Sequence, residues 1–123
     1  MQSAPSRINA KRRMSGPIVG GYTEQDPNSP DIKPWVEKAV HNYNKQSNHA
    51  NLHRLVKVHS VHTQVVAGTN YKIKLDVGET NKKNNSDEKL VGDEEVSNVK
   101  TITATVFHQP WTNTEEYKFD NLL

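Results

Sequence analysis

Histidine is the residue type in this sequence with the clearest capacity for metal chemistry, because a neutral imidazole is a common metal ligand. The chain has six histidines, and four of them lie close together, at His49, His53, His59 and His62. His59 and His62 are three residues apart on a predicted strand, so they face opposite sides unless a bulge intervenes. No cysteine or carboxylate completes a set of metal ligands. We therefore predict solvated surface histidines, no bound metal and no cofactor.

Nucleophilic and acid–base chemistry has no recognisable set of residues here. The sequence has no GxSxG motif, no glycine-rich phosphate loop, no paired-histidine metal motif and no pair of carboxylates flanking a recognisable cleft. The absence of cysteine also excludes disulfides, thiolate zinc sites, iron–sulfur clusters and a cysteine nucleophile. We predict that the protein is not an enzyme.

The residues that point to a function are apolar side chains in predicted turns. One turn must fall at Gln64, Val65, Val66, Ala67 and Gly68, because strand alternation restarts directly afterwards and the glycine is suited to positive φ. Two β-branched residues and an alanine are poor turn formers, and such departures are expected at functional or strained sites. This turn is therefore a candidate binding element.

A second unusual turn places Pro110 and Trp111 between two predicted strands. Proline ends strand pairing, and the indole ring of Trp111 is expected to be exposed. In an up-and-down meander successive turns alternate between the two ends of the sheet. The two unusual turns are separated by one further connection, so they are expected to share an end.

An apolar segment near the N-terminus completes a candidate surface. If it arrives beside the two turns, the three segments form an apolar ridge, which marks a partner site on a soluble protein. In the alternative, the two valines fold inward and Trp111 caps the core. We define the apolar ridge as Ile18, Val19 and Gly20 together with residues 64–68 and 110–111.

One helix is predicted, beginning at Asp31. Its apolar residues recur at helical spacing, at Ile32, Trp35, Val36, Ala39, Val40 and Tyr43. Asp31 is expected to cap the N-terminus, which places Pro34 in the first turn, where a missing N–H has no partner to lose. The helix should end between Asn44 and Asn48, where polar residues accumulate.

Four runs of residues have the pattern of β-strands, at 55–66, 69–78, 99–108 and 115–122. The first run changes parity between Val58 and Val61, which indicates a bulge. The fold class is therefore α+β, with one long helix packed across an antiparallel β-sheet of four to five strands. The polar connection between the second and third runs is long for a loop, so it is expected to be mobile or an excursion at the sheet edge.

Length and charge indicate one domain with a basic tail. A chain of 123 residues suits a single core, and we predict a flexible tail over 1–16 and one domain over 17–123. The tail cations lack interleaved aromatic residues, which makes them a weak signal for nucleic acid or membrane. No apolar run approaches the roughly 18–20 residues of a spanning helix or the stretch typical of a signal peptide. We predict neither a nucleic-acid nor a membrane partner.

The three segments of the apolar ridge resemble the three signature elements of the cystatins, which inhibit papain-like cysteine proteases. Gly20, the run from Gln64 to Gly68, and the Pro110–Trp111 pair occur in the family's order around a single helix. Residues 41–45 and 68–71 are also similar to the family, and the resemblance covers residues 18–122 in outline. It implies a cystatin-like fold.

The resemblance also implies a mechanism. The protein would be a reversible, non-covalent, tight-binding inhibitor of papain-like proteases of the cathepsin L, B or S type. Ile18 and Val19 would occupy non-primed pockets, and Gly20 would let the backbone bend away from the catalytic thiolate. Residues 64–68 would block the catalytic Cys and His, and Trp111 would pack on the primed side. The alternative is a cystatin-fold binding module that does not inhibit proteases.

Three further expectations follow from the resemblance. The protein would be a monomer that also forms a domain-swapped dimer, because a strained valine in the turn relaxes when the two strands straighten. Asn48 lies where some secreted cystatins carry a site for legumain, although His49 replaces their aspartate. In its absence of cysteine the sequence resembles the intracellular stefins, whereas in its Pro-Trp pair it resembles secreted members of the family. Localisation is therefore cytoplasmic if the chain is complete and secreted if it is a processed form.

Overall fold

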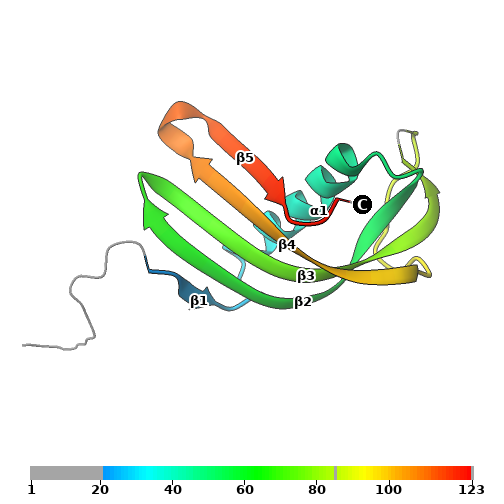
Figure 1. The fold of residues 1–123 in the computed structure, drawn as a ribbon, viewed down its shortest axis with the longest axis horizontal. Coiled ribbons are helices and arrows are strands. Elements are labelled where there is room, and N and C mark those ends of the chain that lie inside the picture. Colours follow the sequence, from blue (N-terminus) through cyan, green and yellow to red (C-terminus); the bar gives the residue numbers. More distant parts are fainter. Residues whose placement is uncertain (1–20, 85, 123) are drawn as a thin grey trace, which may run out of the picture.

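One helix lies across a five-stranded antiparallel sheet in the computed structural model, which describes residues 21–84 and 86–122 (Figure 1). The strands follow one another in sheet order, β1-β2-β3-β4-β5. This confirms the predicted α+β class, while the 1–16 tail and the start of the predicted domain lie outside the described residues. The elements are β1 (Thr23–Gln25), α1 (Lys33–Ser47), β2 (Asn51–Val66), β3 (Gly68–Lys83), β4 (Ser97–Gln109), a 3₁₀ turn (Pro110–Thr112) and β5 (Thr114–Phe119).

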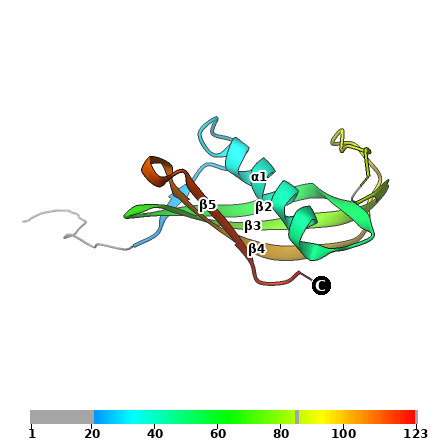
Figure 2. The same ribbon diagram turned by 90° about the horizontal axis from the view of Figure 1, so that it is seen from above.

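The core forms between α1 and the sheet face that the helix covers (Figure 2). The predicted helical stripe is buried, except for Trp35, which is only partly covered. Each fully buried aliphatic side chain contributes about 1.5–3 kcal/mol relative to exposure. The core residues are Ile32, Val36, Ala39, Val40 and Tyr43 from the helix, with Val61, Ile73, Leu75, Val77, Ile102, Ala104 and Val106 from the strands.

The predicted cap at the helix N-terminus is wrong. Ile32 rather than Asp31 occupies the N-cap position, and no side chain caps the helix there. A backbone turn leads into the helix instead, because the N–H groups of Ile32 and Lys33 both donate to the carbonyl of Ser29, at 2.9 and 3.0 Å. Pro34 lies in the first turn as predicted, and the helix ends at Ser47 within the predicted range.

β2, β3 and β4 are longer than their alternation indicated, whereas β5 ends at Phe119 and is shorter than the predicted run over 115–122. β2 begins four residues before the predicted run, and its register against β3 shifts between Val58 and Ser60, which confirms the bulge. β1 was not predicted as a strand, because it has only three residues and all are polar. It forms by pairing with a distant segment, Thr63 to Val61 of β2.

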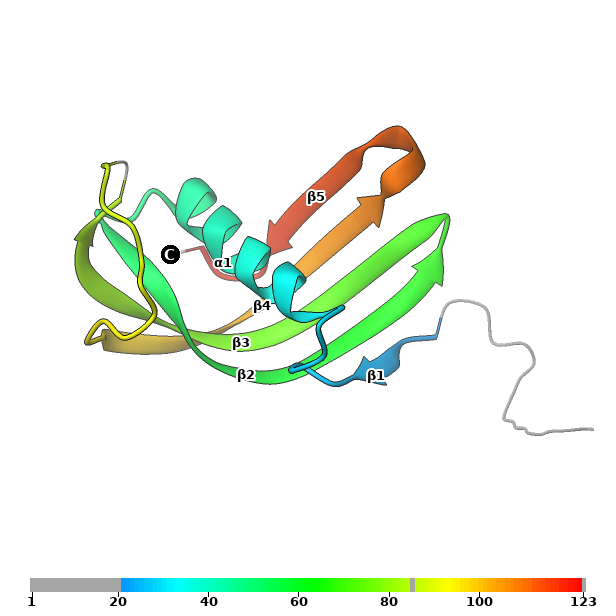
Figure 3. The ribbon, with the colours of Figure 1, turned by 180° about the vertical axis from the view of Figure 1, so that it is seen from behind.

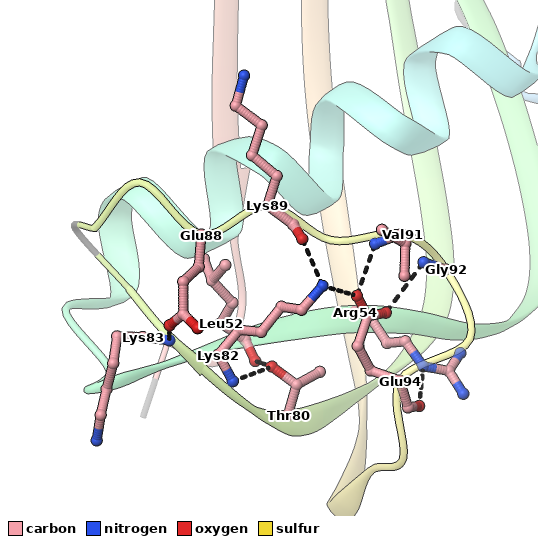
Figure 4. A network of polar contacts seen from close by, with 10 residues as sticks. All are labelled: Leu52, Arg54, Thr80, Lys82, Lys83, Glu88, Lys89, Val91, Gly92 and Glu94. Atoms are coloured by element: carbon pink, nitrogen blue, oxygen red, sulfur yellow. Dashed lines mark hydrogen bonds and ion pairs between the residues drawn. The ribbon is translucent and has the colours of Figure 1, made fainter.

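The β3–β4 connection is shorter and better anchored than predicted, because β3 continues to Lys83. The Glu94 carboxylate holds this connection together. It accepts hydrogen bonds from Lys82 Nζ at 2.8 Å and from the N–H groups of Val91 and Gly92 at 2.6 and 3.0 Å (Figure 4). The Lys82 ammonium, followed by the Val91 N–H, lowers the pKa of Glu94 to about 2. Arg54 Nε holds the same residue through its carbonyl at 2.6 Å.

His53 is buried in the core, so the prediction of a solvated histidine is wrong for this residue. The residue is 5% exposed, and the centre of its ring lies 5.6 Å from the centre of the Tyr43 ring and 4.7 Å from that of the His49 ring. The early start of β2 and its bulges turn this position inward. Asn44 fixes the backbone there, since its amide donates to the His53 carbonyl at 2.9 Å and its Oδ1 accepts from the His53 N–H at 2.8 Å.

This burial predicts that the fold loses stability in mild acid. Burial lowers the pKa of His53, and the neighbouring positive charges of His49 and Lys100 lower it further, while an Asn51 backbone hydrogen bond and the Glu79 carboxylate oppose the shift. The unfolded chain then binds more protons than the folded chain below the ordinary histidine pKa of about 6.5. The stabilising contribution of neutral His53 to the free energy of unfolding should therefore be complete above that pH. It should be lost as the pH decreases through the folded-state pKa.

Urea denaturation at pH 7.5 and 5.0 measures this effect. The parent protein should be less stable at pH 5.0, and His53→Gln should reduce the difference between the two pH values. His41→Gln is the matched control, because His41 is exposed on α1 and its replacement should leave the difference unchanged. An undiminished difference in His53→Gln would assign the acid sensitivity to other groups.

Candidate functional site

The β2–β3 turn is very tight. Val66 pairs with Gly68 across the two strands, which leaves Ala67 alone at the tip. Gly68 has the positive φ that the sequence predicted, at +123°. A Cβ atom there would lie 2.7 Å from the His108 carbonyl oxygen and 2.9 Å from the Phe107 ring. Only glycine satisfies both the backbone conformation and the close approach of β4.

The side chains before this turn point into solvent. Val65 is 75% exposed and Val66 is 42% exposed. Two adjacent exposed β-branched residues at a strand end contribute nothing to the core and leave apolar surface in water. The alternative in which the valines fold inward is therefore wrong.

The β4–β5 turn presents the second apolar side chain. β4 ends at Gln109, as the prediction from Pro110 required, and a short 3₁₀ turn carries Trp111. Asn113 then adopts the left-handed conformation, with φ of 55°, and starts the return into β5. Trp111 is 68% exposed, so it does not cap the core.

Both turns lie at the same end of the sheet, which confirms the predicted placement (Figures 1 and 3). The strand register brings Thr69 opposite His108, immediately beyond the first turn. A direct hydrogen bond also joins the two turns, because Gln109 Nε2 donates to the Ala67 carbonyl oxygen at 2.8 Å. Two exposed apolar tips are thus held side by side.

The expected strain at the valines is absent. Val65 and Val66 belong to the extended strand β2, and among the described non-glycine residues only Asn48, Asn98 and Asn113 have positive φ. The positive φ of the turn falls on Gly68, and glycine adopts positive φ without a steric penalty. The prediction of a strained valine is wrong because the turn is shorter than the sequence suggested.

An aromatic cluster supports the two turns from the helix side. The Trp35 ring stacks on the Tyr71 ring with 4.9 Å between ring centres, and it packs against the His108 ring with 4.6 Å between centres. It therefore joins α1 to β3 and β4 close to the two turns. Lys38 Nζ lies 4.6 Å from the centre of the Trp35 ring. This packing gives the loops a rigid base.

A small polar network continues from this base to β5. Lys38 pairs with Glu115 at 3.5 Å, and the Tyr117 hydroxyl donates to the same carboxylate at 2.7 Å. The Tyr117 hydrogen bond is the main cause that lowers the pKa of Glu115, and the Lys38 charge adds to it. Burial, together with the Glu115 carboxylate, raises the pKa of Tyr117. The hydroxyl therefore stays protonated and able to donate at neutral pH.

The third segment of the apolar ridge, Ile18, Val19 and Gly20, lies outside the described residues. The first described strand, β1, pairs antiparallel with β2, with Thr23 opposite Thr63 and Gln25 opposite Val61. Thr63 is three residues before the end of β2, so β1 begins close to the β2–β3 turn.

The remaining histidines do not form a metal site in the described part of the chain, where no group of three metal-binding side chains occurs. His59 instead contacts the Asp76 carboxylate at 2.9 Å. A Thr101 hydrogen bond and then the His59 hydrogen bond lower the pKa of Asp76. No helix within residues 21–84 and 86–122 is long and apolar enough to cross a membrane.

Asn48 lies at the opposite end of α1 from the two turns. It is exposed and forms the C-cap of the helix, with a left-handed φ of 57°. The ring of His49 lies 3.3 Å from the Tyr43 hydroxyl, measured between Nε2 and the hydroxyl oxygen. The predicted second inhibitory site at Asn48 stays a prediction.

Sequence reasoning missed the residues that hold the two turns together. Gln109 and His108 lie in β4 and their contacts come from β3, the first turn and the helix. No periodicity or turn motif assigns such long-range contacts to one glutamine. The one signal in the sequence was its position directly before the Pro110–Trp111 pair.

Comparison with protein families matches residues 20–121 to the cystatin domain model. T-kininogen 2 of Rattus norvegicus is 41% identical over 63 residues, which are 51% of this chain and 15% of that protein. The chain thus spans only a small part of this longer relative. Onchocystatin of Onchocerca volvulus is 30% identical over 120 residues, covering 89% of this chain and 72% of that protein.

A solved structure gives the same result for the fold. The crystal structure of Al-CPI superimposes with a TM-score of 0.72 at 33% sequence identity, covering 83% of this chain and 96% of the other. The similarity therefore extends through the helix and the sheet that position the two turns.

Proposed function

Because the chain belongs to the cystatin family, whose members are generally cysteine protease inhibitors and not enzymes, we propose that it is a reversible, non-covalent, tight-binding inhibitor of papain-like cysteine proteases. The proteases of this proposal are of the cathepsin L, B or S type. The observation that carries the proposal is the pair of linked turns, with Val65 and Trp111 largely exposed at one end of a rigid sheet.

The two turns would act as a wedge in the active-site cleft. Residues 64–68 would cover the catalytic Cys and His, and Pro110 with Trp111 would pack on the primed side. Protease–inhibitor interfaces bury about 800 Å² per partner, and their energy concentrates in a few central residues. Exposed apolar side chains on preformed loops suit this role, because little conformational freedom is lost on binding.

The tight turn also explains why such a wedge would resist cleavage. A substrate must lie extended so that its scissile carbonyl meets the nucleophile in near-attack geometry. The backbone around Ala67 is folded into a hairpin, with Val66 and Gly68 paired across it. The inhibitor would block the thiolate without presenting a bond to it, so inhibition would be reversible.

The N-terminal segment would fill the other side of the cleft. The register of β1 supports this, because the antiparallel pairing directs the chain before Thr23 toward the end of β2 that carries the first turn. Ile18 and Val19 would then enter non-primed pockets, and Gly20 would let the backbone turn away from the thiolate. The alternative remains a cystatin-fold binding module without inhibitory activity.

Deletion of residues 1–20 tests the role of this segment. The truncated protein should inhibit papain-like proteases more weakly, and the loss should be largest for enzymes with apolar non-primed pockets, because Ile18 and Val19 would fill those pockets. Inhibition constants for several proteases measure this. Deletion of residues 1–13 alone is the control and should leave inhibition intact. Equal inhibition by the full and truncated proteins would remove the segment from the interface.

The inhibitor would act as a monomer, and we propose that a domain-swapped dimer also forms. β2 and β3 have sixteen residues each and are joined through Ala67 alone, so straightening this turn would make one continuous strand. After heating, size-exclusion chromatography should show a dimer that no longer inhibits, because swapping removes the first turn. Elution as monomer alone would contradict the dimer.

A further inference from the structure

Gln109 uses both ends of its side-chain amide to connect the two turns. Its Nε2 donates to the Ala67 carbonyl oxygen at 2.8 Å, and its Oε1 accepts from the Thr112 hydroxyl at 2.7 Å. The orientation of the amide follows from its partners, since a carbonyl can only accept and therefore requires the NH₂ group. One side chain thus bonds to the tip of the first turn and to the 3₁₀ turn that carries Trp111.

The connection continues along the second turn. The Thr112 and Thr114 hydroxyl oxygens lie 2.7 Å apart, and the Thr112 hydroxyl also lies 3.2 Å from the Gln109 carbonyl oxygen. Each hydroxyl can donate one hydrogen bond and accept another, so the chain of contacts runs from β5 through Thr112 and Gln109 to Ala67. Hydrogen bonds in such a chain polarise and strengthen one another.

The backbone alone does not supply this link. β3 and β4 are paired up to Thr69 and His108, but Ala67 and the 3₁₀ turn extend beyond the last pair between these two strands. Gln109 itself pairs with Thr114 in β5, so its backbone is fixed while its side chain reaches across. The relative position of the two tips beyond the sheet therefore depends on the Gln109 side chain.

We infer that Gln109 is a positioning residue that joins the two turns into a single rigid inhibitory unit, an inference that rests on the proposed function. The hydrogen bond to Ala67, here called the Ala67 arm of the amide, sets the distance between the first turn and Trp111. The hydrogen bond from Thr112, the Thr112 arm, fixes the amide in place. Preformed loops lose less freedom on binding than independent ones. Loss of the link should therefore appear mainly as faster dissociation of the protease complex.

Three substitutions separate the two arms of the amide. Gln109→Met removes both arms at similar length, Gln109→Glu keeps an acceptor for Thr112 but repels the Ala67 carbonyl, and Gln109→Lys keeps only a donor. We expect papain inhibition to weaken about tenfold in the Met and Glu variants, through faster dissociation, and less than threefold in the Lys variant. Melting temperatures should remain close to that of the parent, because the affected bonds are exposed at the loop tips.

Gln46→Glu is the matched control. Gln46 Nε2 also donates to a backbone carbonyl in an exposed bond, to Tyr117 at 3.0 Å, but it lies near the C-terminal end of α1. The same change of charge and the same kind of lost bond should leave papain inhibition unchanged.

Amide hydrogen exchange in the free protein gives a readout that is independent of inhibition. The Met and Glu variants should exchange faster at Ala67 and Trp111 than the parent, while exchange in the middle of β3 should not change. Parent-like inhibition in Gln109→Met would overturn the inference, and so would parent-like exchange at the two turns. A parent protein that fails to inhibit papain would overturn the proposed function, and the exchange data would then still decide whether Gln109 links the turns.

Discussion

Replacing Trp111 with alanine is expected to weaken papain binding at least tenfold while the fold stays intact. Trp111 is 68% exposed in the free protein, so removal of its indole ring leaves no cavity in the core. In the proposed complex the ring would become buried at the centre of the primed side. Truncation of a central tryptophan in an interface costs roughly 2 kcal/mol or more, which corresponds to about a 30-fold loss of affinity.

Val99→Ala is the control for this prediction. Val99 is also half exposed on β4, but it lies near the start of that strand, away from the two turns. Inhibition constants and melting temperatures should be measured for both variants. Unchanged affinity of Trp111→Ala for papain would place the tryptophan outside the interface, and a large drop in melting temperature would assign it a structural role.

Replacing Val65 with aspartate is expected to have an even larger effect, with at least a 100-fold loss of inhibition. Val65 is 75% exposed, so a carboxylate there remains hydrated in the free protein and should not destabilise it. In the complex the first turn would be pressed against the protease cleft, where the charge loses its water and gains no partner from this chain. An unpaired charge buried in an interface costs about 2–5 kcal/mol or more.

Val91→Asp is the matched control for the second prediction. Val91 is 74% exposed, almost the same as Val65, but it lies in the β3–β4 connection at the other end of the sheet (Figure 1). The same substitution at this position should leave the inhibition constant within a factor of about two. A comparable loss in both variants would mean that net charge, and not contact of the first turn, explains the effect.

Local patterns in the sequence predicted the parts of the fold that depend on local rules. The apolar stripe on α1 and the alternation in β3 and β4 reflect burial against one common core, which period alone reveals. The parity change in β2 correctly indicated its bulge, and Gly68 was correctly assigned a positive φ. The shared end of the two turns followed from the meander, because each strand in this sheet pairs with its neighbours in the chain.

Features that depend on distant partners escaped the same reasoning. β1 is polar and exists through its pairing with β2, and the helix starts on a backbone turn at Ser29 and not on the carboxylate of Asp31. His53 is buried because β2 starts early and is held by Asn44 of the helix. The Gln109 link requires three segments to meet, which no pattern within one segment can encode.

Titration of active papain with the purified 123-residue protein, read with a fluorogenic substrate, decides whether the protein is an inhibitor. We expect stoichiometric and reversible loss of protease activity, with the inhibitor recovered uncleaved after dissociation. The two exposed turns, held together at one end of the sheet, would then be the inhibitory surface. A folded monomer that leaves papain fully active, or that is consumed as a substrate, would rule out the proposed inhibition and favour a binding module without inhibitory activity.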